Sequence, residues 1–324
     1  MRRAATLFLL TLPALALALA PGALAAQGTG TTAGILLEVP ATARALALGG
    51  AYAAVVGDEG SVFVNPAGLA PIHRLAAGMS QERGFFGSTL STGAAAVRMG
   101  RLDLGLGFAY LDLGGDSVVV PDPAFGGDRG MTTGALISAY HALAVGAIAY
   151  RRGLLSVGAS VKYLREHVGT GGAGDWTAHG VGADLGIAAA LFDIAALGVV
   201  VQNIGGDVRS SDGGRTPLPR TVRVGFTLNF IDPQGTSRLM ATTDWVAPPG
   251  GDSYWAIGVE GGAVARGVGV ALRAGLAAGR AASDRRGLTY GGGLIFHGLH
   301  VDYAVQGHDV TGMPSHRIGL GVVR

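Results

Sequence analysis

Large apolar residues alternate with polar or small residues along most of the chain. In residues 102–110 every even position is large and apolar, and every odd position is charged or small. Residues 222–230 and 299–306 repeat this pattern, and residues 155–163 follow it closely. Successive side chains of a β-strand point to opposite faces, so a period of two predicts strands with one apolar face. The chain is therefore predicted to be all-β.

The pattern predicts fourteen strands, most of them about 9 to 13 residues long, as a tilted strand needs to cross a membrane. Short turns at one rim and long loops at the other are typical of the periplasmic and extracellular ends of a membrane barrel. The expected short turns are residues 99–100, 151–153 and 297–298, and the expected long loops are residues 114–130, 169–176, 205–219 and 279–286. The expected strands are residues 73–82, 89–98, 101–112, 134–150, 154–166, 177–191, 194–204, 220–231, 237–246, 253–263, 266–276, 287–296, 298–306 and 315–324.

The contents of the two strand faces distinguish a membrane barrel from a soluble β-sandwich, which would also alternate. One face carries the large apolar side chains, whereas the other carries glycine, alanine, serine and scattered charges of both signs. Inward charges such as Lys162, Arg223, Asp302 and Arg317 are compatible with a plugged or a water-filled lumen. We therefore expect a transmembrane antiparallel β-barrel of about 14 strands, with a soluble β-sandwich or soluble barrel as the alternative.

The composition agrees with a chain that exposes apolar surface to lipid. Of its residues 49% are hydrophobic and 14% are charged, 57 are glycine, and the mean hydropathy is +0.40. After residue 25 no uninterrupted apolar segment reaches the roughly 18 residues of a membrane-spanning helix, so a closed barrel surrounded by outer-membrane lipids is expected. Aromatic residues near the strand ends are expected to form the girdles that meet lipid headgroups; they are Tyr110, Tyr150, Tyr163, Trp176, Trp245, Tyr254, Trp255 and Tyr303.

Residues 1–25 are expected to be a cleaved secretory signal peptide. Arg2 and Arg3 precede the apolar residues 7–20, and residues 23–25 form a small-x-small cleavage site. Its removal takes two of the 24 basic residues and leaves as many as the 22 acidic ones, so the pI of 9.1 does not indicate a nucleic-acid partner. The absence of cysteine excludes a disulfide framework and cysteine-ligated metals.

Motifs of enzymes and cofactor sites are missing, so no catalytic residue, cofactor or metal is expected. Residues 169–174 fit the pattern G-x-G-x-x-G, but the residues that follow alternate and would not form the helix that meets a phosphate. The eight histidines are dispersed, and His297 and His300 would point to opposite faces of one hairpin. There is no G-x-S-x-G motif of a serine hydrolase.

Residues 26–72 do not alternate and are expected to form a separate segment before the barrel of residues 73–324. Residues 41–56 are rich in alanine, and Asn65 before Pro66 has the sequence of a helix N-cap and first helical residue. The segment is too apolar for a free periplasmic tail. We expect it to pack inside the barrel as a hatch or plug.

Several stretches resemble the PorV/PorQ family of FadL-like outer-membrane barrels. Residues 43–55, Asp58 and residues 62–69 are similar to the N-terminal signature of that family. Further similar stretches are residues 201–205, residues 217–219 with 223–225, and residues 316–321. The resemblance therefore runs from residue 43 to the C-terminus and covers most of the mature chain.

The resemblance implies a fourteen-stranded barrel whose lumen holds a hatch with an Asn-Pro-Ala motif. On this basis the hatch or gating candidates are Asn65, Pro66, Ala67, Gly68, Gly49, Gly50, Tyr52 and Phe63. It also implies a hydrophobic small-molecule ligand that leaves the barrel sideways or through the hatch. The PorV branch implies an alternative function, an accessory or shuttle protein of type IX secretion that binds secretion components or cargo and does not transport. For both functions the protein is expected to lie in the outer membrane of a Gram-negative bacterium.

Overall fold

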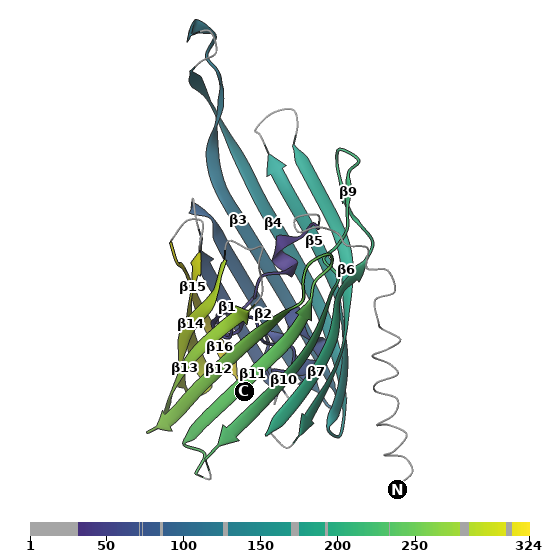
Figure 1. Ribbon diagram of the computed structural model, residues 1–324, viewed down its shortest axis with the longest axis vertical. Coiled ribbons are helices and arrows are strands. Elements are labelled where there is room, and N and C mark those ends of the chain that lie inside the picture. Colours follow the sequence, from purple (N-terminus) through teal and green to yellow (C-terminus); the bar gives the residue numbers. More distant parts are fainter. Residues whose placement is uncertain are drawn as a thin grey trace.

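The computed structural model describes residues 32–70, 72, 74–84, 87–125, 129–169, 175–191, 194–232, 234–278, 285–308 and 313–324. The expected signal peptide lies outside these residues. Most described residues from residue 75 onward belong to β-strands, and Figure 1 shows these strands arranged as a tilted barrel.

Fourteen of the described strands form one closed antiparallel barrel, which confirms the predicted fold. Each strand pairs with its neighbour in the sequence, except that β7 pairs with β10, and β1 pairs with β16 to close the ring. The barrel strands are β1 (Leu75–Arg83), β2 (Thr89–Met99), β3 (Leu102–Pro121), β4 (Gly130–Arg152), β5 (Leu155–Gly169), β6 (Trp176–Leu191), β7 (Ala195–Gly205), β10 (Thr221–Ile231), β11 (Ser237–Ala247), β12 (Tyr254–Ala265), β13 (Val268–Ala278), β14 (Arg285–Phe296), β15 (Leu299–His308) and β16 (Ser315–Val323).

The β3–β4 hairpin is longer than the sequence predicted. The prediction of a loop over residues 114–130 is wrong for most of that segment, because β3 continues to Pro121 and β4 begins at Gly130. Shifts of register near Asp112 and Ser117 absorb the glycine-rich stretch while the two strands stay paired. Figure 1 shows the resulting ribbon projecting beyond the other strands.

The connection between β7 and β10 also contains strands that the sequence did not reveal. Residues 205–219 were predicted to be a loop, but they include β8 (Val208–Ser210) and β9 (Arg215–Thr216). These two strands pair with each other, and β8 pairs with β6. The sheet is therefore extended locally at the rim of the long connections.

The large apolar side chains face outward, as the alternation predicts. Leu106 on β3 and Leu272 on β13 are 70% and 71% exposed, whereas Asp103 and Asp302 on the inner face are buried. An apolar exterior around a filled, partly polar interior is the arrangement of a membrane barrel and the reverse of a soluble one. Among the expected girdle residues, Tyr254 faces inward and is buried, because it packs in a cluster with residues of the hatch and wall.

The described part of the expected plug segment, residues 32–70 and 72, is called the hatch and runs through the lumen from one rim to the other. The backbone N–H of Ala33 donates to the carbonyl of Pro217 (3.1 Å) at the rim of the long connections, and the carbonyl of Ala70 accepts a hydrogen bond from Arg98 at the opposite rim. None of the described helices is long and apolar enough to cross a membrane. The helical segments are η1 (Ile35–Leu37), α2 (Ala43–Ala47), α3 (Ser61–Val64) and η2 (Pro66–Leu69) in the hatch, and η4 (Pro123–Phe125) at the tip of the β3–β4 ribbon.

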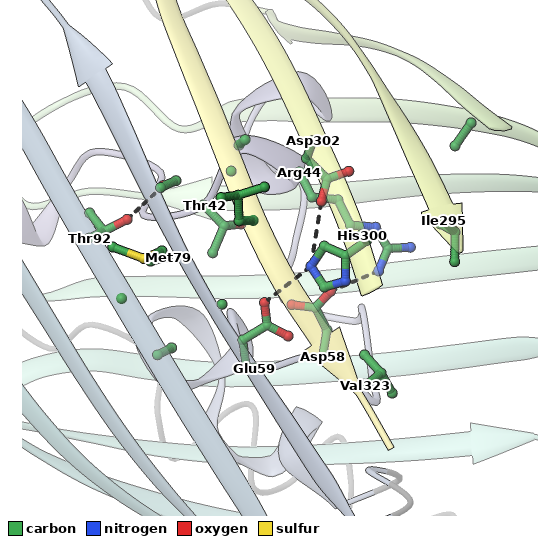
Figure 2. A pocket seen from close by; sticks show the side chains of 18 of the residues that line it. Thr42, Arg44, Asp58, Glu59, Met79, Thr92, Ile295, His300, Asp302 and Val323 are labelled. Carbon is green, nitrogen blue, oxygen red and sulfur yellow. Dashed lines mark hydrogen bonds and ion pairs between the residues drawn. The ribbon is translucent and has the colours of Figure 1, made fainter. Parts of the chain in front are cut away.

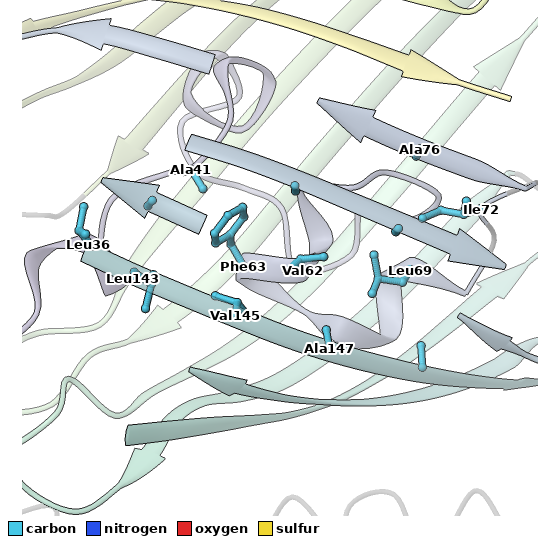
Figure 3. Packing of buried hydrophobic residues seen from close by; sticks show 14 of the residues in the cluster. Leu36, Ala41, Val62, Phe63, Leu69, Ile72, Ala76, Leu143, Val145 and Ala147 are labelled. Carbon is cyan, nitrogen blue, oxygen red and sulfur yellow. The ribbon is translucent and has the colours of Figure 1, made fainter. Parts of the chain in front are cut away.

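The hatch packs an apolar surface against one side of the wall. Val62, Phe63 and Leu69 form a buried cluster with Leu143 and Val145 of β4, as Figure 3 shows. Burial of apolar side chains is the main favourable contribution to folding. This cluster therefore fixes the middle of the hatch to the barrel.

Candidate functional site: the interface of hatch and barrel

Asn65 connects two turns of the hatch with the barrel wall. The residue is fully buried, and its Oδ1 accepts a hydrogen bond from the backbone N–H of Ala67 (3.1 Å). Its Nδ2 donates to the carbonyls of Ala53 (2.7 Å) and of Ile187 on β6 (3.5 Å). Asn65 therefore is the N-cap of η2, with Pro66 as the first helical residue, and it also binds the wall.

Gly49, Gly50 and Tyr52 lie on the side of the hatch that faces β10 to β13. The two glycines follow α2 with φ angles of +67° and +80°, a left-handed conformation that glycine adopts without steric cost. Tyr52 is fully buried. The backbone N–H groups of Tyr52 and Ala53 both donate to Oδ2 of Asp244 on β11, each over 2.9 Å. A single wall carboxylate thus fixes this part of the hatch.

Phe63, Ala67 and Gly68 lie against a different part of the wall. The carbonyl of Phe63 accepts a hydrogen bond from Nζ of Lys162 (3.5 Å), and the carbonyl of Ala67 accepts one from Oγ of Ser156 (2.9 Å); both donors are on β5. Gly68 packs so closely within the hatch that a side chain there would overlap its neighbours. The structure therefore places the eight candidates in one segment but in two groups, which contact different strands.

Glycines on the inner face of the wall let the backbone of the hatch lie directly against it. A Cβ atom at Gly258 would be 2.8 Å from the carbonyl oxygen of Leu48, and one at Gly225 would be 2.9 Å from the amide nitrogen of Ala54. In a close-packed interior such short contacts force the hatch to shift. The same close approach of the hatch is found at Gly158 (β5), Gly186 (β6), Gly198 (β7), Gly275 (β13) and Gly291 (β14). The glycine-rich inner face is thus explained by a filled lumen.

Polar side chains of the wall also bind the backbone of the hatch. Arg223 on β10 donates to the carbonyl of Gly50 (2.9 Å), and Gln202 on β7 donates to the carbonyl of Val64 (2.9 Å). Short helices leave carbonyl groups without a partner, and these bonds satisfy two of them. The alternation indicates that such side chains point inward, but it does not reveal their partners. Those lie 138 and 173 positions away in the sequence.

A cavity of about 290 Å³ lies between the hatch and the wall, and Figure 2 shows Arg44, Asp58 and Asp302 among the charged side chains that line it. Arg44 of α2 binds Asp58 of the hatch and Glu260 of β12, each with an N–O distance of 2.8 Å. Arg273 of β13 binds the same Glu260 (2.6 Å) and Asp302 of β15 (2.5 Å). A continuous chain of ion pairs therefore joins the hatch to three strands of the barrel.

Glu59 faces the same cavity from the hatch. Its Oε1 is 3.9 Å from Nε2 of His300 on β15, and that nitrogen is 3.6 Å from Asp302 (Figure 2). Burial raises the pKa of Glu59 to about 8, and the nearby carboxylate of Asp58 adds to this effect. Glu59 therefore retains its proton at neutral pH. Among the described residues no three His, Cys, Asp or Glu side chains are grouped so that they could hold a metal ion.

No protein-family profile and no curated protein matches the chain. Solved barrels match it over most of its length. The toluene transporter TbuX of Ralstonia pickettii has a TM-score of 0.56 and 15% identity, with 93% of this chain and 100% of that chain covered. The toluene transporter TodX of P. putida has a TM-score of 0.58 and 13% identity, with coverages of 92% and 99%. A Pseudomonas aeruginosa FadL homologue has a TM-score of 0.57 and 14% identity, with coverages of 87% and 98%; at these identities the likeness shows a shared barrel fold.

Proposed function

We propose that this protein is a FadL-like outer-membrane barrel through which hydrophobic small molecules pass passively, under the control of the hatch. The observation that carries the proposal is the hatch itself, which fills the lumen of a closed barrel with an apolar exterior. Such an exterior needs a lipid environment. Two structures of the same fold are described as toluene transporters, and this supports a hydrophobic class of substrate.

The hatch is held too firmly to leave the lumen as one body. Its backbone lies against wall glycines on five described strands, its side chains lie against glycines on at least two more, and several wall side chains bind it. Each buried polar group that loses its partner costs about 1–3 kcal/mol. Breaking all of these contacts together is therefore far more costly than moving one turn, so we propose that passage requires only a local rearrangement.

The turn of residues 57–60 is the part of the hatch best suited to move. It lines the cavity through Gly57, Asp58 and Glu59, and the φ angle of +79° at Gly57 shows a tight reversal of the chain there. The turn is held closed by the ion pair of Asp58 with Arg44 and by the hydrogen bond of the Gly57 N–H to the carbonyl of Gly68 (2.8 Å). Displacing it would widen the cavity while the glycine contacts of α2 stay in place.

Entry of a fluorescent hydrophobic probe into cells that lack a barrel of this type tests the proposal. Cells that produce the wild-type barrel are expected to take up the probe faster than cells without it. Gly68→Ala is expected to change the rate, because its Cβ would be 2.8 Å from the Val55 carbonyl and would disturb the partner of Gly57. Gly206→Ala is the matched control, since a Cβ there meets nothing within 4 Å. A wild-type barrel that leaves probe entry unchanged would refute the proposal.

A second candidate function is that of an accessory or shuttle protein of type IX secretion, and the β3–β4 ribbon is the observation that favours it. Among the described residues, the part of β3 after Asp112 pairs only with β4, and the part of β4 before Ser138 pairs only with β3. Val119, Met131 and Leu136 are exposed on this ribbon. Free strand edges with apolar side chains suit a protein partner. Cross-linking of the ribbon to secretion components, lost on deletion of residues 114–136 while probe entry never exceeds that of barrel-free cells, would favour this function.

A further inference from the structure

Four basic residues form a continuous row across the outer face of the barrel, near the rim of the long connections. Arg165 of β5 pairs directly with His179 of β6, His179 pairs with Arg209 of β8, and Arg209 pairs with Arg215 of β9. Directly paired residues carry their side chains on the same face of a sheet, and all four residues are exposed. β5 pairs with β6, β6 with β8 and β8 with β9, and Figure 1 shows the upper parts of these strands on the same side of the barrel.

The basic row lacks acidic partners in the described part of the chain. Like charges placed directly opposite each other on neighbouring strands repel. Glu166, although adjacent in sequence, points into the lumen and accepts a hydrogen bond from the Gly34 N–H (3.1 Å). Asp212, in the turn between β8 and β9, accepts hydrogen bonds from the Gly214 N–H (3.0 Å) and from Nε1 of Trp176 (3.3 Å). The positive charge of the row therefore remains available to an external anion.

The basic row lies at the border of the apolar exterior. The next outward-facing pair toward the short-turn rim is Tyr163 with Val181, which are 46% and 55% exposed. On the other side of the row His167 packs against Tyr140, with a distance of 5.0 Å between the ring centroids. Basic and aromatic side chains beside an apolar band mark the level of lipid headgroups in membrane proteins. The row therefore faces headgroups, not the hydrocarbon interior.

We propose that the basic row is a docking surface for the phosphate groups of phosphorylated lipids in the leaflet next to the long connections. A guanidinium group can bind a phosphate through two parallel hydrogen bonds, and three of the four residues are arginines. Neighbouring strands lie about 4.8 Å apart, so the row extends over roughly 14 Å, enough for more than one phosphate. A lipid also explains why the row follows the apolar border, which an acidic protein partner does not. This inference requires a membrane-embedded barrel but not a transport function.

Lipid binding by the purified mature barrel in detergent micelles tests this proposal. The probes are a diphosphorylated glycolipid (lipid A) and the same lipid without phosphates, measured by native mass spectrometry at two salt concentrations. The test variant is Arg165→Gln/Arg209→Gln/Arg215→Gln. The control variant removes three exposed arginines from the opposite rim, Arg74→Gln/Arg101→Gln/Arg152→Gln. A third variant, with lysine at the three positions of the row, keeps the charge and loses the two-pronged geometry.

The wild type is expected to bind the phosphorylated lipid at least about tenfold more tightly than the dephosphorylated one, and less tightly at high salt. The glutamine variant is expected to lose this preference, the control to keep it, and the lysine variant to keep part of it. If neither the glutamine nor the lysine variant binds the phosphorylated lipid, resistance of the barrel to unfolding in SDS shows whether the variants are folded. Folded variants that do not bind would indicate that the site requires the geometry of arginine, and unfolded variants would indicate misfolding. Equal binding of the two lipids by the wild type would overturn the proposal. An unchanged preference for the phosphorylated lipid in the glutamine variant would also overturn it.

Discussion

The side-chain amide of Asn65 donates a hydrogen bond of 2.7 Å to the carbonyl oxygen of Ala53, and both residues are fully buried. The two residues are 12 positions apart in the hatch, and the same amide nitrogen reaches the carbonyl of Ile187 on β6. One side chain thus holds two turns of the hatch together and fastens them to the wall. The strength of this connection can be measured separately from any transport.

Removal of the Asn65 amide is expected to destabilise the refolded barrel. Asn65→Ala leaves the Ala53 carbonyl and the Ala67 N–H buried without a partner, which should lower the free energy of unfolding by about 2–5 kcal/mol. Asn65→Asp keeps the acceptor for Ala67 but places a carboxylate oxygen against the Ala53 carbonyl, so its loss should be at least as large. Urea unfolding in detergent measures both. Equal stability of the three proteins would contradict the structural role of the amide.

Two glycines of β12 give a matched test of the contact between hatch and wall. Gly258→Ala is expected to destabilise the barrel by about 1–3 kcal/mol, because its Cβ would be 2.8 Å from the Leu48 carbonyl. Gly261→Ala should change stability by less than about 0.5 kcal/mol, since nothing lies within 4 Å of a Cβ there. Urea unfolding of both variants compares them on the same strand. If the two variants lose the same stability, the hatch does not rest on Gly258.

The buried carboxylate of Asp244 is expected to contribute more to the stability of the barrel than an exposed carboxylate does, because two buried N–H groups donate to it. Asp244→Ala leaves the N–H groups of Tyr52 and Ala53 without an acceptor and should cost about 2–5 kcal/mol. Asp244→Asn retains one acceptor oxygen and should cost less. Proteolysis of the hatch in the refolded barrel provides the readout. Cleavage of the hatch at the wild-type rate in Asp244→Ala would contradict this account.

The raised pKa of Glu59 predicts that the barrel loses stability as the pH rises. Below the ordinary pKa of 4.5 the carboxyl group is protonated in both the folded and the unfolded chain. Between 4.5 and about 8 only the folded chain keeps the proton, so the free energy of unfolding falls with increasing pH, by at most about 1.4 kcal/mol per unit. Above about pH 8 this contribution becomes constant.

Glu59→Gln isolates that contribution, because glutamine resembles the protonated side chain. The groups that face Glu59, namely Arg44, Asp58, His300 and Asp302, are present in both proteins. The difference in stability between variant and wild type should therefore grow in favour of the variant from pH 5 to pH 8. Unfolding curves at pH 5, 6.5, 8 and 9 measure it. A difference that does not depend on pH would show that Glu59 ionises normally.

The strands of the barrel were predictable because one face of each strand has to meet lipid. The strand expected at residues 237–246 is Ser237–Ala247, and the one expected at residues 89–98 is Thr89–Met99. The β3–β4 ribbon was missed because it projects beyond the apolar band, so its glycines and prolines carry no alternation. Register shifts near Asp112 keep such a segment paired, and they are not visible in the sequence.

The contacts of the hatch were only partly predictable. Asn65 before Pro66 has the local sequence of an N-cap, but its bond to Ala53 depends on the path of the chain in between. The alternation places Gly258 on the inner face of β12 and Gly261 on the outer face, but it does not reveal that Gly258 meets the carbonyl of Leu48. The basic row was missed for the same reason, because His179 and Arg209 become neighbours only when β8 joins β6.

A disulfide that fastens the hatch to the wall tests most directly whether molecules pass while the hatch stays in place. A Cβ at Gly319 of β16 would be 3.3 Å from Cβ of Ala43 in α2, close to the separation of about 3.5–4.5 Å in disulfides, and the chain has no other cysteine. The measurement is entry of the hydrophobic probe through the Ala43→Cys/Gly319→Cys barrel before and after reduction. Equal entry in both states, above that of cells without the barrel, is the predicted result. Entry of the probe only after reduction would mean that the whole hatch must leave the lumen. If the probe enters in neither state and does not enter through the wild-type barrel either, transport through the lumen would be contradicted.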